Sequence, residues 1–548
     1  METQKKNFQN IYISKLNPHY GRLLSSLDTE TTSISKGSFD RTWWCWKFTD
    51  FSASRFQEGA YFLAWLSTSA LSPINDNKKY YFLELTLSSI LFWQKLQHKD
   101  GSFDEAYPYE RSFAATAFTS FYISCSIERI KKNIPYKDLN NILKSLEKAG
   151  LWLSRNVENH GILSNHLAAA AAALQVIYEL TGDTKFISAK NKYLDIIYCN
   201  QHSSEGWLKE YGGADPGYQT HAMFYLAEIE RRTNDPKLLN SLSKATDFIS
   251  WFVNPDGSYG GEFASRGTKF VFPAAFEILS EKIPLAAGIA TYNRKLLRKN
   301  LGVWVQHMDV WNQFPMFNNY LFAAENVKVI KEYKKIPLQK LNIRKIYKDA
   351  GLIVYKKNKQ ILYCGTKMGG TIKIYNMNGN LFYEDCGYYV KNLKNFATSQ
   401  NSFHYEIKQI AKKGLFIKIH SNFNLMSKQR FTSLKFILFR IFTITIGRNP
   451  FFSKLVKNFL VYILINKKTK FKGKLIREVS VSDDNIVKID DKIYDSLIKP
   501  QPMVRGLPFH MGSSRYGSLD DFMLAEQNLE APVKEKNFYN RIVNFTLN

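Results

Sequence analysis

The feature that most constrains the fold is a short motif that recurs in the first 335 residues. A charged residue, a glycine and an aromatic residue lie close together in "DGSF" (100–103), "EGW" (205–207) and "DGSY" (256–259). The glycines are 105 and 51 residues apart, which indicates a unit of about 52 residues with one degraded copy near residue 154. Repeats of this length, each made of two helices and a loop, predict stacked helical hairpins.

One helix of the repeat is clear from its sequence. Ser164 can cap it, the run "NHLAAAAAALQVIYEL" fills it, and Gly182 ends it. The alanines permit close packing, as an inner helix in a ring of hairpins requires. Because about 300 residues would hold about five or six such hairpins, we expect an α/α toroid.

The period changes after about residue 350, where short β-branched and aromatic runs such as "GLIVYKKNKQILYCG" are separated by turn signals. This pattern predicts an antiparallel β-sandwich. The expected fold class is therefore α+β and multidomain, with the toroid followed by the sandwich. The expected parts are an N-terminal segment (1–40), the toroid (41–335), a linker (336–350) and the sandwich (351–548).

The chain carries a formal net charge of +27, and a surplus of this size attracts polyanions. Residues 407–477 contain 17 Lys or Arg and no Asp or Glu. Within them an insertion at about 427–474 holds two apolar runs that basic residues interrupt, so neither is long enough to span a membrane. Two interpretations stay open: basic amphipathic helices on an anionic membrane surface, or an insertion packed on its own domain with solvated lysines.

Several other function classes are disfavoured by the sequence. The five cysteines are far apart and lack a Cys-x-x-Cys pair, and we expect neither a metal nor a cofactor. Nucleic-acid binding is not expected, because most of the basic excess lies outside the helical repeats. The first residues, "METQKKNFQNIYISKL", show no secretory signal, so we expect a cytoplasmic location, with peripheral attachment to the inner membrane as an extension of that idea.

Polar residues that suit catalysis gather in loops that share one position in the repeat, and a toroid would bring such loops to one rim. On a helix, Tyr218 and His221 lie on the same face. The candidates form four clusters: Asn165 with His166; Glu210, Tyr211, Tyr218 and His221; Glu262 with Arg266; and Glu105, Tyr109 and Arg111. Taken singly, these residues also fit a helix cap, a packing tyrosine, a loop ion pair and a solvated rim.

Together the clusters suit abstraction of a proton next to a carboxylate, as at carbon 5 of a uronic acid. The enzyme must neutralise that carboxylate with donors such as Asn, His or Arg. It also needs a base, and a tyrosine near cations can serve. The same tyrosine can then return its proton to the leaving oxygen in β-elimination, whereas a second acid on the opposite ring face would give epimerisation.

The stretches "NHLAAAAAALQVIYEL" and "EGWLKEYGGADPGYQTHAMFYLAEI" resemble the heparinase II/III-like lyases and, more distantly, the toroidal alginate lyases. The segment "AGLIVYKKNKQILYCGTKMGG" is similar to the first strands of that family's sandwich. The resemblance implies that Tyr218 is the catalytic acid/base and that Asn165 and His166 neutralise the uronate carboxylate or assist as base. His221 and Glu210 are implied as neighbours in the cleft.

This chain departs from the family where the first sandwich strands usually present a histidine, because it reads "KMGGTIKIY" there. The first Asn of the family's Asn-Asn-His is Ser164. Three functions therefore stay open on an acidic polysaccharide: a lyase, a uronyl C5-epimerase of a bacterial capsule or O-antigen, and a non-catalytic glycan-binding or assembly protein at the membrane surface.

Overall fold

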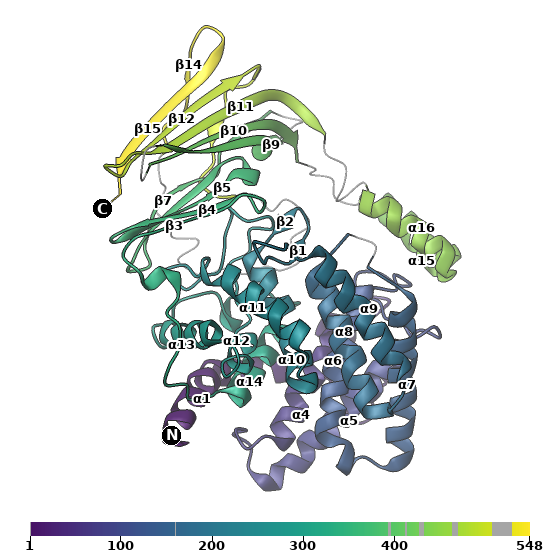
Figure 1. Cartoon of the computed structure of the whole chain (residues 1–548). Coiled ribbons are helices and arrows are strands. Elements are labelled where there is room, and N and C mark those ends of the chain that lie inside the picture. Colours follow the sequence, from purple (N-terminus) through teal and green to yellow (C-terminus); the bar gives the residue numbers. More distant parts are fainter. Residues whose placement is uncertain are drawn as a thin grey trace.

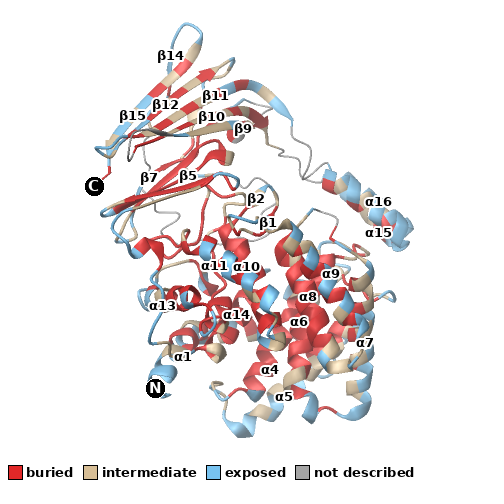
Figure 2. Ribbon diagram, viewed as in Figure 1, coloured by how far each residue is buried: buried red, intermediate tan, exposed pale blue. Residues whose placement is uncertain are grey.

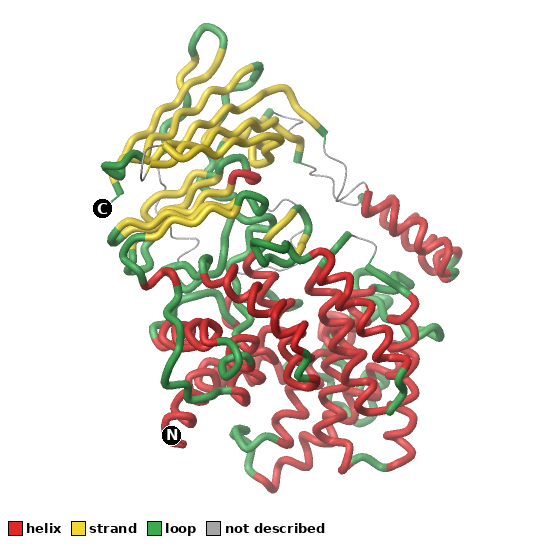
Figure 3. Tube along the Cα trace, viewed as in Figure 1, coloured by secondary structure: helices red, strands yellow, loops and turns green. Residues whose placement is uncertain are grey.

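The computed structural model describes residues 2–158, 161–392, 396–410, 414–426, 432–462, 469–506 and 529–547. Helices form the N-terminal half and strands the C-terminal half, apart from two helices that leave the sheets (Figures 1 and 3). The predicted fold class, an α/α toroid followed by antiparallel sheets, is confirmed.

Among the described residues, six helices form a closed inner ring in which each packs on the next. They are α4 (Ala60–Thr68), α6 (Phe113–Ile130), α8 (Ser164–Thr181), α10 (Pro216–Thr233), α12 (Ala274–Ile278) and α14 (Gln313–Asn326). The outer helices are α5 (Asp76–Leu96), α7 (Tyr136–Arg155), α9 (Lys185–Asn200), α11 (Pro236–Ser250), α13 (Pro284–Arg298) and α1 (Glu2–Leu16). Alanines 168–173 of α8 are all buried, which lets α6 and α10 approach it closely.

The first helix completes the ring. Helix α1 packs on α14 and α13, and the Tyr12 hydroxyl donates to a Glu277 carboxylate oxygen at 2.6 Å. Residues 1–40, which we separated from the toroid, thus supply an outer helix to it. The short helices α2 (Tyr20–Leu24) and α3 (Arg41–Trp44) follow α1.

The repeated glycines have a common structural cause. Gly101 has φ +99°, and a Cβ there would lie 2.2 Å from the carbonyl oxygen of Lys148 on the outer helix α7. Gly37 has φ +90° and meets Ser88 of α5 in the same way, also at 2.2 Å. Only glycine fits so close to a backbone with this φ. The stretch "KGSF" (36–39) is therefore a further copy of the motif, which our sequence analysis missed.

Two predicted details differ from the structure. Helix α8 begins at Ser164 and its N-cap is Leu163, so Ser164 is not the cap; its hydroxyl donates to the Lys209 carbonyl oxygen at 2.8 Å. Gly182 ends the helix in the left-handed conformation, as predicted. Strand β3 starts at Ile343, inside the segment that we interpreted as a linker.

The C-terminal half contains two antiparallel sheets. The smaller has the order β3-β4-β5-β6-β7: β3 (Ile343–Tyr347), β4 (Leu352–Lys357), β5 (Gln360–Gly365), β6 (Thr371–Asn376) and β7 (Leu381–Asp385). The larger has the order β13-β8-β9-β10-β11-β12-β15-β14: β13 (Gln501–Pro502), β8 (Tyr388–Lys391), β9 (Phe396–Ile410), β10 (Gly414–Leu425), β11 (Lys470–Val481), β12 (Ile486–Tyr494), β15 (Phe538–Thr546) and β14 (Val533–Lys534).

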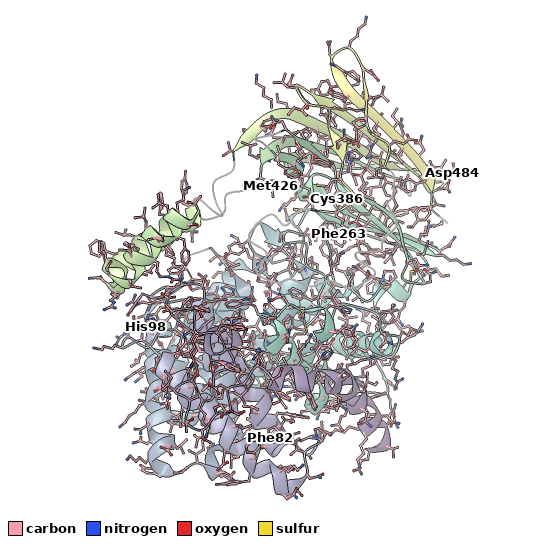
Figure 4. All side chains as sticks on the ribbon, turned by 180° about the vertical axis from the view of Figure 1, so that it is seen from behind. Phe82, His98, Phe263, Cys386, Met426 and Asp484 are labelled. Atoms are coloured by element: carbon pink, nitrogen blue, oxygen red, sulfur yellow. The ribbon has the colours of Figure 1, made fainter. Side chains whose placement is uncertain are left out.

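The smaller sheet is buried on both faces. Val354 and Tyr363 point to the core of the helical domain, whereas the alternating Ile353 and Leu362 pack on the larger sheet. Figure 2 shows these strands in the colour of buried residues, and Figure 4 places Phe263 at the boundary between helices and sheets. Stacking of Phe263 on Tyr363, with ring centroids 5.0 Å apart, joins the two domains.

Candidate active site

The stretch "EYGGADPGYQTH" folds as a tight turn followed by a helix, next to the sheets. Strands β1 (Lys209–Glu210) and β2 (Gly213–Ala214) form a small hairpin, and α10 begins at Pro216 (Figure 1). Asp215 is the N-cap, because its carboxylate accepts the N–H of Tyr218 at 3.1 Å. Tyr218 is thereby fixed on the first turn of an inner helix.

The same carboxylate also positions Arg266 against Tyr218. Asp215 accepts the backbone N–H of Arg266 at 2.9 Å and the hydroxyl of Thr268. The guanidinium carbon of Arg266 then lies 3.6 Å from the ring centroid of Tyr218 and 5.0 Å from that of Tyr211. Asp215 thus couples the start of α10 to a loop about 50 residues further along the chain.

Glu210 joins this pair to the start of α8. The Asn165 side-chain amide donates to both Glu210 carboxylate oxygens, at 2.8 and 3.0 Å, and Arg266 Nη1 lies 3.4 Å from Glu210 Oε2. Burial raises the pKa of Glu210 against the opposing effects of Arg266 and Asn165. Burial would lower the pKa of Arg266, but Tyr218, Glu210 and Asp215 outweigh it and raise that pKa. Arg266 therefore stays cationic.

A second group of residues surrounds Phe118 of α6. The rings of His166 and His221 both have centroids 5.4 Å from that of Phe118, and the guanidinium carbon of Arg55 lies 4.8 Å from it. His166 Nδ1 is 2.6 Å from the Glu158 carboxylate. A carboxylate at one ring nitrogen fixes the orientation of a histidine.

His221 differs from His166, because it is buried. Its ring stacks on Phe272 with centroids 4.0 Å apart, and its Nε2 is 3.2 Å from the Tyr225 hydroxyl. Burial, and then the nearby Arg55, His166 and Arg266, lower the pKa of His221 well below its ordinary value. His221 is thus neutral and forms part of the buried wall of the site.

Solvent reaches this part of the protein through half-buried residues. Tyr218 is 5% exposed, and Asn165 and Glu210 are buried. Tyr211, His166, Arg266, Arg55 and Glu105 are partly exposed residues, although the side chains of Arg266 and Arg55 are only 7% and 11% exposed. Two largely buried guanidinium groups and an imidazole thus lie beside the buried tyrosine.

Three predicted substrate-binding residues have other partners. Glu262 does not pair with Arg266; it pairs with Lys269 at 3.1 Å and with Lys373 of β6, which also reaches Glu384 of β7 at 3.0 Å. Burial would raise the pKa of Glu262, but Lys269 and Lys373 outweigh it and lower that pKa to about 2. In the structure Glu262 fastens the helical domain to the sandwich.

Tyr109 and Arg111 contact the inserted helices. Arg111 Nη2 donates to the Arg448 carbonyl oxygen at 2.6 Å, and the Ser453 hydroxyl donates to the Tyr109 carbonyl oxygen at 2.7 Å. Glu105, from the same loop, faces the site instead, 3.3 Å from Arg55 Nη1.

Our sequence analysis missed Arg55, Phe118, Glu158 and Lys373. The spacing of Arg55 and Glu58, whose side chains lie 2.5 Å apart, was the one local signal for Arg55. Lys373 lies on β6, within the stretch "KMGGTIKIY" where the resemblance led us to expect a histidine.

Among the described residues, one group could hold a metal ion: His202, Glu205 and Asp349, whose ligand atoms lie within 4.8 Å of one another. The Glu205 oxygens already accept the backbone N–H groups of Asp349 and Ala350 at 2.9 and 2.8 Å, and the Trp207 Nε1–H at 2.8 Å. The group acts as a clamp between the helical domain and the smaller sheet.

Comparison with known proteins finds matches among polysaccharide lyases. Residues 53–275 match the family model of the ulvan lyase N-terminal domain. Sequence comparison with curated proteins gives no match. Among solved structures, a Paenibacillus xanthan lyase (TM-score 0.55, 9% identity) is matched over 100% of this chain and 58% of its own length. This chain therefore spans less than two thirds of that enzyme.

A chondroitin AC lyase from Streptomyces coelicolor A3, solved with chondroitin sulphate, is matched with TM-score 0.51 and 7% identity, over 91% of this chain and 68% of the enzyme. A heparan sulfate lyase from Pedobacter heparinus has TM-score 0.40 and 11% identity, over 90% of this chain and 71% of the enzyme. The first two likenesses show the fold. The predicted resemblance to toroidal polysaccharide lyases is confirmed at that level.

Proposed function

We propose that this chain, which has the fold of the toroidal polysaccharide lyases, cleaves a uronate-containing acidic polysaccharide by β-elimination. The observation that carries the proposal is the guanidinium of Arg266, held 3.6 Å from the Tyr218 ring centroid by its contacts with Asp215 and Glu210. A permanent cation against a phenol ring, at the start of an inner helix, suits proton transfer.

The first task of such a site is to bind the uronate carboxylate. Arg55, Arg266 and His166 have side chains that are 11%, 7% and 17% exposed, and they supply cationic or hydrogen-bond donor groups. Partial burial strengthens their attraction for an anion relative to water. Neutralising that carboxylate stabilises the second negative charge, which forms when the neighbouring carbon loses its proton.

The second task is the proton transfer itself. In the proposed step, the ionised Tyr218 oxygen takes the proton from carbon 5, and the electron pair of that bond forms the double bond between carbons 4 and 5. The bond from carbon 4 to the glycosidic oxygen breaks. Tyr218 then returns the proton to that leaving oxygen, so the enzyme is regenerated. Arg266 lies against the Tyr218 ring during this step, and Asn165 and Glu210 hold Arg266 and the helix starts in place.

The test compares two tyrosines that each lose one hydroxyl. Tyr218→Phe should lower turnover by about 10²-fold or more, because a general base contributes about 10²–10⁴. The control is Tyr259→Phe, where a buried hydroxyl donates to Asn293 at 2.6 Å outside the site. Ulvan, xanthan, chondroitin sulphate and heparan sulfate would be screened for the ultraviolet absorbance of the unsaturated uronate.

The outcomes separate the alternatives. Absorbance that disappears in Tyr218→Phe and persists in Tyr259→Phe supports elimination. Exchange of the carbon-5 proton in deuterated water without new absorbance would replace the lyase by an epimerase. Saturable binding of the polysaccharide without either signal would leave a glycan-binding protein.

A further inference from the structure

Two helices inserted between β10 and β11 form a hairpin, hereafter the α15–α16 hairpin. It consists of α15 (Ser433–Ile444) and α16 (Pro450–Val461), which a short turn joins. It extends away from the sheets and lies beside the helical domain (Figure 1). Figure 4, the opposite view, labels His98 on the helical domain below the hairpin, and the His98 and Tyr109 ring centroids are 5.3 Å apart.

The side of the hairpin that faces the protein is largely polar. Its buried residues are Thr443, Gly447, Ser453, Lys457 and Val461. Arg440 pairs with Asp50 at 3.2 Å, and Lys457 lies 3.7 Å from Glu110. These contacts, those of Arg111 and Ser453 described above, and the packing of Phe439 on Tyr107 with ring centroids 4.9 Å apart attach the hairpin to the toroid.

The outward side is apolar, which is the reverse of an ordinary surface helix. Within residues 432–462, twelve large apolar side chains are exposed, among them Leu438, Phe451, Leu455 and Phe459. Figure 2 shows most of the hairpin in the colour of exposed residues. Contiguous apolar surface of this kind marks an interaction site. The alternative interpretation, an insertion packed on its own domain with solvated lysines, differs from the structure in that the hairpin packs on the helical domain and exposes these side chains.

Exposed cations accompany the apolar side chains. Lys435, Arg448 and Lys454 are exposed on the hairpin, and residues 407–477 contain no Asp or Glu. Each helix is 12 residues, or about 18 Å, long. No helix in the described part of the chain is long and apolar enough to cross a bilayer. Apolar side chains flanked by cations on short helices are typical of segments that lie in the membrane interface.

We propose that the α15–α16 hairpin binds the surface of an anionic membrane, with its apolar side chains in the headgroup region and its lysines on the lipid phosphates. Charge complementarity selects this occupant, because a second copy of a chain with net charge +27 would be repelled. The hairpin contacts the loop of Glu105, Tyr109 and Arg111, so the membrane would lie next to the site proposed for the polysaccharide.

The test is flotation of the full chain with vesicles of phosphatidylglycerol and phosphatidylcholine, compared with phosphatidylcholine alone. We expect binding to the anionic vesicles that weakens with salt. The variant L438S/F451S/F459S should weaken binding by about 100-fold or more. The variant K435Q/K454Q should weaken it by about 30-fold.

The matched control is Y80S/Y136S/L341S, which removes three equally exposed apolar side chains from elsewhere on the chain. It should bind vesicles like the unchanged protein. Absence of the unchanged chain from the anionic vesicles at low salt would overturn the proposal. So would a self-association, measured by sedimentation, that depends on Leu438, Phe451 and Phe459 while no lipid binds. Lyase activity on soluble polysaccharide should persist in both triple variants, which separates this proposal from the one on Tyr218.

Discussion

The buried charges of the sandwich and those beside Tyr218 are balanced differently. In the sandwich, Arg477 binds Asp491 and Asp385 at 2.8 and 2.9 Å, and Arg541 contacts the same two carboxylates. These four side chains are at most 2% exposed. Beside Tyr218, the guanidinium of Arg266 lies 3.4 Å from the Glu210 carboxylate and against the Tyr218 ring, and its side chain is 7% exposed.

The difference between the two clusters shows in the pKa values of their carboxyl groups. Burial would raise the pKa of Asp385, but Arg477 and Arg541 outweigh it and lower that pKa to about 2. The pKa of Glu210 is raised by burial, in spite of Arg266. The sandwich cluster therefore pairs two guanidinium groups with two carboxylates, whereas the carboxyl group beside Tyr218 keeps a raised pKa next to its cation. Buried groups whose pKa is shifted gather at functional sites.

The largest expected effect is the loss of the sandwich cluster's centre. Arg477→Met leaves two buried carboxylates short of a cation, which should cost about 3–5 kcal/mol of stability. All ten tryptophans lie before residue 335, so their fluorescence follows the helical domain, and hydrogen exchange in β11 and β12 reports on the sandwich. The control Lys418→Met breaks only the exposed pair with Glu478, worth about 0–1 kcal/mol. An equal, small effect of both changes would refute the structural role of the cluster.

The next effect concerns the cation beside Tyr218. Arg266→Lys keeps the charge but loses the planar group that lies on the Tyr218 ring, so we expect turnover to fall by about 10²-fold with little change in stability. Arg231→Lys, at the far end of α10, changes the same side chain where it pairs with Glu228 and should leave turnover unaltered. If Arg266→Lys lowers stability but not turnover, Arg266 has a structural role like that of Arg477 and the proposed role beside Tyr218 is wrong.

The smallest effect is the order in which acid affects the two clusters. Asp385 has a lowered pKa, so its contribution of about 2 kcal/mol is present above its ordinary value of 3.8 and is lost as the pH falls toward about 2. Glu210 has a raised pKa, so the folded protein protonates it at a higher pH than the unfolded chain does. Acid should therefore alter turnover before it opens the sandwich.

The measurement follows turnover and hydrogen exchange in β11 and β12 over the same falling pH series. In Glu210→Gln, the acid limb of turnover should shift while the exchange profile of the sandwich stays the same. If acid opens the sandwich first, the contrast between the two clusters is wrong.

Much of the fold was predictable because its signals are local. The glycine motifs and the alanine-rich helix revealed the repeat, and Tyr218 and His221 were placed on one helix face by spacing alone. The copy at Gly37 carries the same "GSF" letters as the copy at Gly101, so residues 1–40 were recognisable as part of the toroid. The packing of α1 on α14 was not recognisable from the sequence, because it depends on how the ring of helices closes.

The sequence by itself determined the repeat, the change from helices to strands at about residue 350, the basic insertion, and the loops that bear Asn165, His166, Tyr218 and Arg266. These features follow from residue spacing and composition, which can be read along the sequence without knowing which segments pack together. Only the tertiary structure decided the partners: Arg266 with Glu210, 56 residues away, and Glu262 with Lys373. Which residues form ion pairs depends on which loops come together when the helices and sheets pack. The same packing set the direction in which the inserted helices face.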